Sequence, residues 1–525
     1  MHVPKQCSLL GRQALFRCIA LLLASIGGLA LPPSRAADWQ QYRGPNHDGS
    51  TSESLRTDWA ASPPKVLWKK TIAPAWSSFS ISQGKLFTQA ARSNGSTDRE
   101  YCIALDAATG TELWARELDA ADYPDAGTGD TDGPRSTPTV DGDRVYVFTS
   151  YLKLYCLRAD TGAVVWKRDF IQEFPGTTVI DWQNAASPLL IGDLLYVNSN
   201  VSNRRLMAIR KLDGVTAWST QDDRMTHASP VYATLGGRPQ VMFLTAKGLV
   251  GVRPDTGSVL WRHSFTPSST STAASPIASG DIVYASCAYA QGAWTARVTA
   301  SGDTFSVSAT DYKRGSAYQN HWATPVAHNE HLYGIVENGF RSLACFSLSG
   351  RTNRWITQSV GDQNPGYGSL IKVGGKLLVL TERGRLVLLE PNPEKYDEIA
   401  RFDVLSGTCW NHPIFSNGRL YARSSTQMVA VDLAPPTVPL PPLQISAQWF
   451  PDTKRLRVEA RAADASVLNP AAAPRLELHT RPSLAVASSW TAAPVEFTAA
   501  NGALIAELSL DAGFDQQFVR IRVRD

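Results

Sequence analysis

Short apolar runs separated by turn residues fill most of the chain, and no long stretch places apolar residues at helical spacing. In the first recurring pattern, a turn of small or polar residues leads into an apolar strand that often ends on an aromatic residue. The clear members are SQGKLF (82–87), DGDRVY (141–146), IGDLLY (191–196), SGDIVY (279–284), NEHLY (329–333) and NGRLY (417–421). The less regular members are LGGRPQVMF (235–243) and VGGKLLVL (373–380). The pattern predicts eight β-hairpins in an all-β chain.

In the second pattern, a turn ends in Gly and Trp follows four residues later. The members are ATGTELW (Gly110, Trp114), DTGAVVW (Gly162, Trp166), LDGVTAW (Gly214, Trp218) and DTGSVLW (Gly257, Trp261), with LSGRTNRW one residue longer between Gly350 and Trp355. Glycine adopts the positive φ of a tight hairpin turn without steric cost. Each member therefore predicts a turn followed by a strand that carries Trp.

A third pattern pairs a small residue with proline. The prolines are Pro138, Pro188, Pro230, Pro276, Pro325 and Pro413. Their spacings are 50, 42, 46, 49 and 88 residues, and the last equals two repeats of 44. This period is typical of a four-stranded propeller blade, whose sheet faces are buried by radial stacking on the neighbouring blades.

Counting the repeats predicts how the ring closes. The strands with Trp68, Trp114, Trp166, Trp218, Trp261 and Trp355, together with strands near Phe305 and Phe402, give eight repeats. The last hairpin leads to MVAVDLA (428–434) and lacks a fourth strand, whereas KVLWKKTI (65–72) has no hairpin before it. We therefore predict an eight-bladed β-propeller over residues 65–434, closed by its N-terminal strand.

Several of these repeats resemble a known family. LYCLRADTGAVVW and ASPVYATLGGRPQVMFLTAKGLVGVRPDTGSVLW are similar to pyrroloquinoline quinone (PQQ)-like propeller repeats, as in quinoprotein alcohol dehydrogenases and BamB-like proteins. The leader DWQQYRGPNHDGS (38–50) and GPRSTPTV (133–140) are similar to segments of exported proteins of this kind. The resemblance implies the propeller fold, and it leaves the activity open because function depends on the site.

The N-terminal residues predict export. Residues 1–36 combine Lys5, Arg12 and Arg17 with an apolar stretch from Cys18 to Leu31, and small residues fit cleavage near Ala36. The 14 apolar residues are short for a membrane span, although an uncleaved anchor is the alternative. We expect a periplasmic or secreted protein without stable membrane insertion after cleavage.

The remaining segments are assigned from composition. Residues 37–64 form an N-terminal extension, residues 435–442 are a proline-rich linker, and residues 443–525 hold strand-like runs that predict a small β-sandwich-like domain. This last domain is either a docking module or a passive C-terminal domain.

Charge and cysteine content narrow the function. The chain has 51 basic and 47 acidic residues, and removing Lys5, Arg12, Arg17 and Arg35 leaves 47 of each. A near-neutral protein argues against a nucleic-acid partner or an anionic membrane held by bulk electrostatics. Five cysteines remain after processing, and three share one repeat position, which favours core filling over a disulfide framework.

Propellers commonly bind ligands at one end of the central channel. Polar and aromatic residues gather just before the small–Pro pairs, where we expect that end. The candidate ligand-binding residues are Trp76, Arg135, Trp182, Asn184, His227, Asn320, His321, Trp322, Tyr367, Trp410, Asn411 and His412. Such a set suits a sugar, a quinone or a peptide segment. In the alternative, the Trp residues plug the channel while His and Asn satisfy buried backbone groups. A metal site built from the three histidines is not favoured.

Catalysis is not favoured by the sequence either. The resemblance implies that active quinoproteins hold PQQ with Ca²⁺ on Glu and Asn, and use a catalytic Asp and a disulfide between adjacent cysteines. No cysteines are adjacent here, and GDTDG (129–133) lacks the later ligands of a calcium loop. The candidate carboxylates, none in a recognisable ligand pattern, are Asp130, Asp132, Asp181, Asp222, Asp223 and Asp311. We therefore expect no catalytic residues and no firm cofactor, in a non-catalytic binding or scaffolding module with a protein or carbohydrate ligand. A PQQ/Ca-dependent oxidoreductase and a carbohydrate-binding propeller are the alternatives.

Overall fold

The computed structural model describes residues 38–123, 132–267, 272–313, 318–337, 339–349, 351–436, 442–450, 452–453, 455–464, 466–468, 476–481, 491–493, 495–509 and 518–523. The predicted signal segment lies outside these residues. The described residues divide into two compact units, residues 38–435 and residues 436–523.

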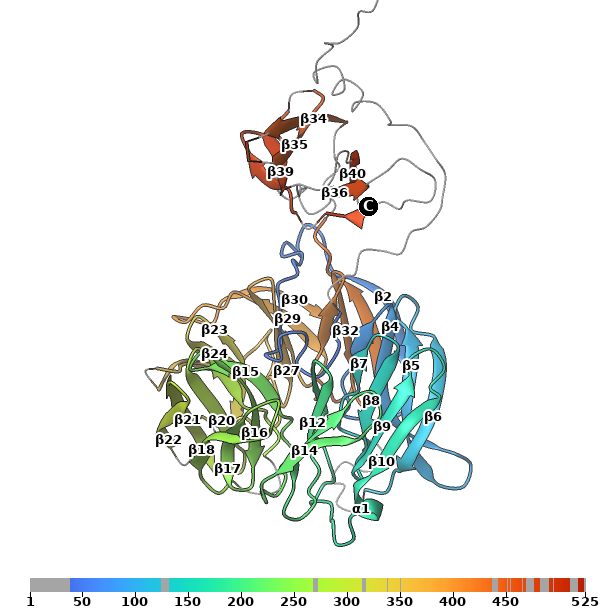
Figure 1. The fold of residues 1–525 in the computed structure, drawn as a ribbon, viewed down its shortest axis with the longest axis vertical. Coiled ribbons are helices and arrows are strands. Elements are labelled where there is room, and N and C mark those ends of the chain that lie inside the picture. The colour runs from blue at the N-terminus through green and yellow to red at the C-terminus, as the bar shows by residue number, and fades with distance from the viewer. Residues whose placement is uncertain are drawn as a thin grey trace, which may run out of the picture. The chain divides into compact units, whose positions relative to one another are not determined.

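The larger unit is built from antiparallel sheets of four strands that follow one another along the chain (Figure 1). The first sheet contains β3 (Ser80–Ser82), β4 (Lys85–Ser93), β5 (Asp98–Asp106) and β6 (Glu112–Ala120), and the second contains β7 (Thr139–Asp141), β8 (Arg144–Phe148), β9 (Lys153–Arg158) and β10 (Val164–Asp169). The third contains β11 (Leu189–Ile191), β12 (Leu194–Asn198), β13 (Leu206–Arg210) and β14 (Thr216–Thr220). The fourth contains β15 (Val231–Leu235), β16 (Arg238–Thr245), β17 (Gly248–Val252) and β18 (Val259–Ser264).

Three further sheets continue this order, and a fourth combines strands from both ends of the unit. They are β19 (Ile277–Ser279), β20 (Ile282–Cys287), β21 (Gly292–Ser301) and β22 (Thr304–Lys313); β23 (Val326–His328), β24 (His331–Glu337), β25 (Arg341–Ser347) and β26 (Thr352–Thr357); β27 (Ser369–Val373), β28 (Lys376–Leu380), β29 (Arg385–Leu389) and β30 (Glu398–Asp403), with β1 (Ser50–Thr51) added beside β27; and β31 (Ile414–Ser416), β32 (Arg419–Arg423), β33 (Gln427–Asp432) and β2 (Lys65–Thr71). One short helix, α1 (Phe170–Glu173), precedes β11.

The predicted hairpins and Trp strands fall where the sequence placed them. The hairpin motifs form the first two strands of their sheets, with residues of positive φ such as Gly142 and Gly192 in the turns. The strands with Trp are the last strands of their sheets, and Phe305 and Phe402 occupy the same place in β22 and β30. The all-β prediction is therefore confirmed.

Hydroxyl groups link the first strands of neighbouring sheets. Backbone N–H groups just before the first strands donate to the equivalent hydroxyl of the next sheet at 2.9–3.1 Å: His412 to Ser78, Ser78 to Thr137, Thr137 to Ser187, Ser187 to Ser229, and Ser275 to Thr324. First strands also contact one another, as β11 does β15 and β23 does β27. A small hydroxyl residue is needed here because the first strands converge.

Four of the repeat Trp residues dock on the Gly turn of the next sheet. The indole of Trp68 donates from Nε1 to Ala107 O at 3.1 Å, and its face lies against Gly110, where a Cβ would approach Trp68 to 2.8 Å. The same contact joins Trp114 to Gly162, Trp166 to Gly214 and Trp218 to Gly257. Glycine is needed at these positions for two reasons: the backbone has a positive φ, and the indole leaves no room for a side chain. The sequence pattern indicated only the positive φ.

The first strand of the unit completes the last sheet. β2 pairs antiparallel with β33, placing Lys65 opposite Asp432 and Trp68 opposite Ala430. Arg423 of β32 lies across the same junction, 1% exposed, and donates to Thr88 Oγ1 and Gln89 O of β4 at 3.1 Å. Burial lowers the pKa of this guanidinium to about 9. The pairing is the one that the incomplete repeats predicted.

Apolar cores lie between adjacent sheets. One joins Phe87 and Cys102 of the first sheet to Val145 and Leu157 of the second. The five cysteines within the described residues are all buried and free, in agreement with the core-filling prediction.

The C-terminal unit contains two sheets. One orders β34 (Leu443–Phe450), β35 (Arg455–Ala462), β39 (Ala503–Ser509) and β38 (Thr498–Ala500), and the other β37 (Thr491–Ala492), β36 (Leu476–Arg481) and β40 (Phe518–Val523). Buried residues of both sheets, among them Val458, Leu478 and Leu504, share one core.

The Trp–Gly contact predicts unequal effects of two similar substitutions. Gly110 and Gly142 both have positive φ, but a Cβ at Gly142 meets nothing within 4 Å. We expect Gly110→Ala to lower the free energy of unfolding by about 1–3 kcal/mol more than Gly142→Ala, because only Gly110→Ala overpacks an interface. Denaturant titration of both variants measures the difference. Equal losses would contradict the docking role of Gly110.

The closing strand gives a second prediction. Trp68 is 8% exposed, and we expect Trp68→Ala to lower the free energy of unfolding by about 3–5 kcal/mol, as for other buried Trp truncations. Deleting residues 38–72 removes β2 entirely and should lower the melting temperature further. Calorimetric melting checks both. A deletion variant that melts with the parent would show that β2 does not close the ring.

Candidate functional site

One end of the sheets collects the loops that the sequence singled out. In a four-stranded antiparallel sheet, the loop before the first strand and the turn between the second and third strands share one end. We call this end the mouth, and α1 marks it in Figure 1. The segments that precede β3, β23, β27 and β31 bring the aromatic candidates here.

Five of the candidates form a continuous aromatic cluster. Trp76 stacks on Trp410 with ring centroids 4.4 Å apart, and Trp410 lies 4.7 Å from Trp322. Trp322 contacts Tyr367 at 4.4 Å and His321 at 4.2 Å. Four loops from different sheets thus supply one apolar surface.

Two carboxylates hold the cluster in place. Glu337 accepts from Tyr367 Oη at 2.9 Å and lies 3.3 Å from Nδ1 of His321. Burial opposes ionisation of Glu337, but the hydrogen bond from Tyr367 and the neighbouring His321 and Arg341 lower its pKa overall. Glu382 accepts from Trp410 Nε1 at 2.7 Å and from the backbone N–H of Tyr367 at 3.3 Å.

Three buried nitrogens in the cluster have no hydrogen-bond partner among the described residues. They are Nε1 of Trp322 and both ring nitrogens of His321, although Nδ1 lies 3.3 Å from Glu337. A proton on Nδ1 would face Glu337, and Nε2 would then present a lone pair. Burial lowers the pKa of His321, which keeps the ring neutral. A donor and an acceptor therefore lie side by side, unsatisfied, and native structures seldom leave such groups unpaired.

Arg135 joins the cluster through Asp132. Trp76 donates from Nε1 to Asp132 at 3.0 Å, and Arg135 Nη2 contacts both oxygens of the same carboxylate at 3.0 Å. The Arg135 guanidinium also lies 5.7 Å from the ring centre of Tyr123. The sequence left open whether Arg135 pairs with a ligand or with a nearby acid, and here it pairs with Asp132.

His227 and Trp182 lie near this pair but outside the aromatic cluster. Nε2 of His227 is 3.0 Å from the carbonyl oxygen of Asp181. Burial and, second, the charge of Arg135 lower the pKa of His227 to about 4. Trp182 follows Asp181 with a φ of 66° and a half-buried side chain.

The three candidate asparagines donate hydrogen bonds to backbone carbonyl groups. Asn184 donates to Thr149 O at 3.1 Å, Asn320 to Ile335 O at 2.7 Å and Asn411 to Ser77 O at 2.8 Å, and all three are buried. For these residues the structure supports the alternative reading, in which they satisfy buried carbonyl groups.

His412 lies against the N-terminal segment and outside the aromatic cluster. Its ring meets Tyr42 at 5.4 Å, edge to face, and burial lowers its pKa to about 3. The contact is with the N-terminal segment, so His412 does not join His227 or His321. The described residues hold no group of three or more His, Cys, Asp or Glu side chains that could bind a metal ion.

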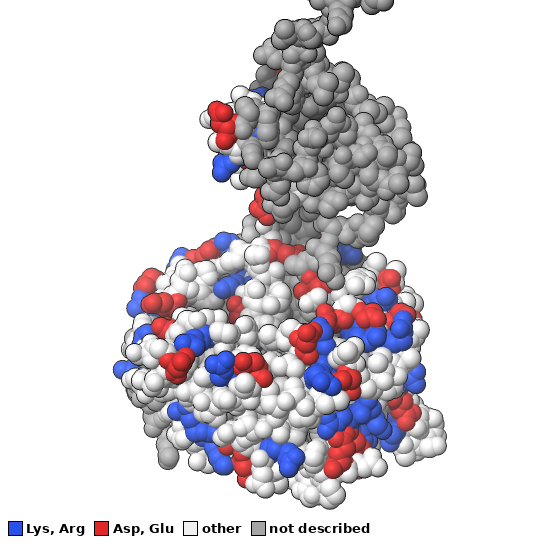
Figure 2. All heavy atoms as spheres, viewed as in Figure 1, with Lys and Arg blue, Asp and Glu red and all other residues white. Residues whose placement is uncertain are grey.

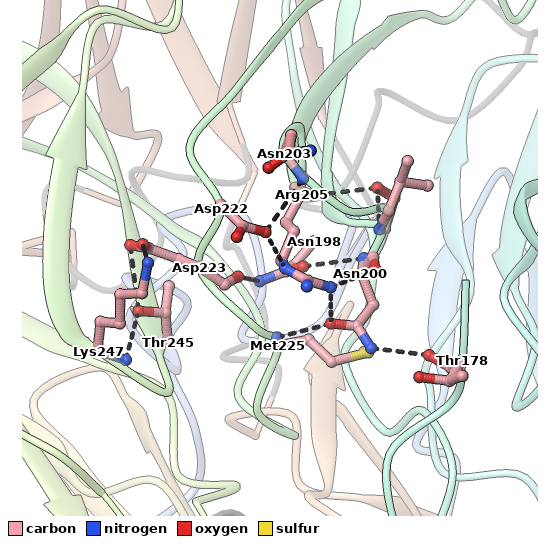
Figure 3. A network of polar contacts seen from close by, with 12 residues as sticks. Thr178, Asn198, Asn200, Asn203, Arg205, Asp222, Asp223, Met225, Thr245 and Lys247 are labelled. Atoms are coloured by element: carbon pink, nitrogen blue, oxygen red, sulfur yellow. Dashed lines mark hydrogen bonds and ion pairs between the residues drawn. The ribbon is translucent and has the colours of Figure 1, made fainter. Parts of the chain in front are cut away.

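The acidic candidates of the neighbouring loops are neutralised by cations (Figure 3). Arg205 donates to Asp222 at 2.7 Å. Asp223 is 2% exposed and pairs with Arg262 at 2.6 Å and with Lys247 at 3.5 Å. Asp130 lies outside the described residues, and the side chain of Asp311 in β22 is not described.

Sequence reasoning missed the residues that the second-to-third turns supply. Tyr289 contacts His321 at 5.0 Å, and Arg341 lies 4.3 Å over the ring of Tyr367. Tyr289 and Phe340 are 54% and 62% exposed, which is unusual for aromatic residues beside a buried cluster. The meander geometry, which puts these turns at the mouth, was the signal that could have found them.

Comparisons with known proteins agree with the repeat pattern. A family model described as outer membrane protein assembly factor BamB matches residues 98–357. The quinohemoprotein alcohol dehydrogenase of Comamonas testosteroni superposes with a TM-score of 0.55 at 11% identity, over 80% of this chain and 84% of that one. The chain contains a PQQ-like β-propeller.

Other relatives of the propeller carry the BamB name. Outer membrane protein assembly factor BamB of Moranella endobia (strain PCIT) is 23% identical over 311 residues, which is 58% of this chain and 61% of the relative. The propeller thus spans less than two thirds of that relative. BamB of Moraxella catarrhalis gives a TM-score of 0.47 at 16% identity, over 70% of this chain and 97% of that one.

The charges at the mouth of the propeller bear on the fit of PQQ. PQQ carries three carboxylates, and the mouth presents Asp132, Glu337 and Glu382 with Arg135 and Arg341 beside them. Both arginines already face a carboxylate, so PQQ would need a further cation to offset its charge. Among the described residues, no helix is long and apolar enough to cross a membrane.

The depressed pKa of His227 predicts a pH-dependent stability. Between pH 6.5, the ordinary pKa of histidine, and about pH 4, His227 is protonated in the unfolded chain and neutral in the folded propeller. The His227 contribution is complete above pH 6.5 and is lost as the pH falls towards 4. We expect the loss of unfolding free energy between pH 7 and 4.5 to be about 2 kcal/mol smaller in His227→Gln. Urea titrations at both pH values test this, and identical losses in the two proteins would contradict it.

Proposed function

We propose that the protein is a non-catalytic binding or scaffolding module, an eight-bladed propeller closed by its N-terminal strand, which binds its partner at the mouth. The eight sheets between β2 and β33, and the pairing of these two strands, support the ring. The observation that carries the function is the aromatic cluster with the unsatisfied Trp322 Nε1 and His321 Nε2. A ligand that offers one acceptor and one donor would satisfy both atoms.

Engagement of the mouth carboxylates favours binding over catalysis. Asp132 is paired with Arg135, Glu337 takes bonds from Tyr367 and Gln319, and Glu382 holds Trp410. A general base must be free to take a substrate proton. Each of these groups instead accepts hydrogen bonds that fix the cluster.

An extended protein segment with apolar side chains fits this mouth. A backbone amide supplies the acceptor and the donor together, and the exposed rings of Tyr289 and Phe340 extend the apolar surface beyond the cluster. The BamB relatives are described as outer membrane protein assembly factors, and outer-membrane strands alternate apolar and polar side chains.

The setting of this function follows the segment assignments. Residues 1–36 act as a signal peptide cleaved near Ala36, which places the protein in the periplasm or outside the cell. Residues 37–64 extend the propeller of residues 65–434, and residues 435–442 link it to the β domain of residues 443–525. Figure 2 shows positive and negative side chains interspersed on the visible face of the propeller, as expected for a partner not held by bulk charge.

Binding of a strand-like peptide tests the proposal. The probe is a synthetic peptide of about 10 residues that alternates aromatic and polar side chains, the length of an outer-membrane strand. We expect Trp322→Phe, which loses only the indole N–H, and Phe340→Ala to weaken the Kd at least about tenfold in calorimetry. Leu212→Ala is the matched control, because Leu212 is 79% exposed in a turn at the opposite end.

Other ligands distinguish the alternatives. Tight binding of PQQ with Ca²⁺, together with dye-linked alcohol oxidation, would replace this proposal by a quinoprotein oxidoreductase. Quenching of Trp fluorescence by oligosaccharides, lost in Trp322→Ala and Trp410→Ala, would favour a carbohydrate-binding propeller. Equal peptide binding by the parent and the Trp322→Phe and Phe340→Ala variants would remove the mouth as the site.

A further inference from the structure

The channel end opposite the mouth is filled by residues 38–51, here called the leader. The leader contacts seven of the eight sheets among the described residues, each in or beside its first strand. Its contacts are Trp39 O with Ile81 N, Gln40 O with Val140 N, Gln41 with Leu190, His47 with Tyr232, Arg43 with Pro325, Ser50 with Lys372, and Tyr42 with His412. One short segment thus contacts nearly every sheet around the channel.

The leader has its own fold. Backbone N–H groups of Gly44 and Gly49 donate to Gln41 O and Arg43 O at 2.9 and 2.8 Å, and Asp48 accepts from Ser50 N at 2.8 Å. Both glycines have a φ of 77°. A Cβ at Gly44 would approach Trp39 to 2.8 Å, and one at Gly49 would approach Arg43 to 2.5 Å. The RGPNHDG sequence therefore encodes a compact turn wrapped on its own side chains.

Arg43 anchors this turn in the channel. Its side chain is 4% exposed and donates to Thr324 O at 3.2 Å, to Pro325 O at 2.6 Å and to Asp48 O at 2.6 Å. All three acceptors are carbonyl oxygens, reached from two nitrogens of the planar guanidinium, a geometry that the single nitrogen of an ammonium group does not reproduce. Burial lowers the pKa of Arg43.

The leader joins the sheets mainly through side chains and turn backbone. Its strand pairing is limited to the two-residue β1 beside β27, in parallel. Its other contacts are hydrogen bonds, ring contacts, the buried arginine, and Trp39, which is 2% exposed and packs in one apolar core with Phe79 and Ile81. This is how a folded peptide is held in a site, and it differs from the continuous ladder by which β2 joins β33.

We infer that this channel end is a peptide-binding site and that residues 38–51 occupy it as an intramolecular ligand, separable from the ring that β2 closes. Arg43 and the two glycines determine its specificity. The partner of this surface is the leader itself, and a second copy of the chain offers the same segment. The inference does not depend on the function proposed for the mouth.

A nick in the folded protein tests the inference. Ala60 and Ala61 are both exposed, so a protease site inserted between them can be cut without unfolding, leaving β2 on the main chain. We expect the N-terminal fragment to remain bound during gel filtration and to be displaced by excess fluorescent peptide of residues 38–60. Peptides with Gly49→Ala or Arg43→Lys should compete at least about tenfold less well.

Each other result overturns the inference. Loss of the fragment with unchanged melting would show that the channel does not bind it. Loss of the fragment together with unfolding, or a fragment that never exchanges while the ring is folded, would make the leader a permanent part of the core. Equal competition by the three peptides would remove the assigned specificity, and dimers formed before cutting would place the leader in a second copy.

Discussion

The stacking of an indole face on a glycine turn is the interaction on which the ring depends. Trp68, Trp114, Trp166 and Trp218 each cover the glycine of the following sheet and hydrogen-bond to a backbone carbonyl there. At these four interfaces the contact limits how closely the neighbouring sheets approach. It also explains why Trp and Gly recur in fixed register in these repeats.

The two ends of the channel are finished in different ways. At the leader end, a compact turn brings backbone groups and a buried arginine to almost every first strand. At the mouth, rings from four loops lie on one another, and buried ring nitrogens of His321 and Trp322 have no hydrogen-bond partner among the described residues. The carboxylates at the mouth accept hydrogen bonds from the aromatic side chains, which favours ligand binding over proton transfer.

The repeat architecture was readable from the sequence because propeller geometry is periodic. The hairpins, the Trp strands and the need for a strand from the N-terminus all follow from spacing, and Trp68 opposite Ala430 is their outcome. The site was readable only in part. Trp76, Trp322 and Trp410 do meet, but Tyr289 and Arg341 come from turns of other sheets, and their proximity depends on the ring and not on sequence distance. Asn184, Asn320 and Asn411 looked like ligand donors because composition cannot show which carbonyl groups lack a partner.

The pairing of β2 with β33 removes the ends from which a stack of repeats would fray. In an open solenoid the terminal repeats have one neighbour each and are lost first, so unfolding begins at an edge of low local stability. Here the sheet that joins β2 to β33 has a neighbour on either side, and opening it means peeling a seven-residue strand while withdrawing Trp68 from Gly110. The barrier to unfolding is then concentrated in one seam. Such a seam lengthens the lifetime of the folded protein, even when the free energy of each sheet is modest.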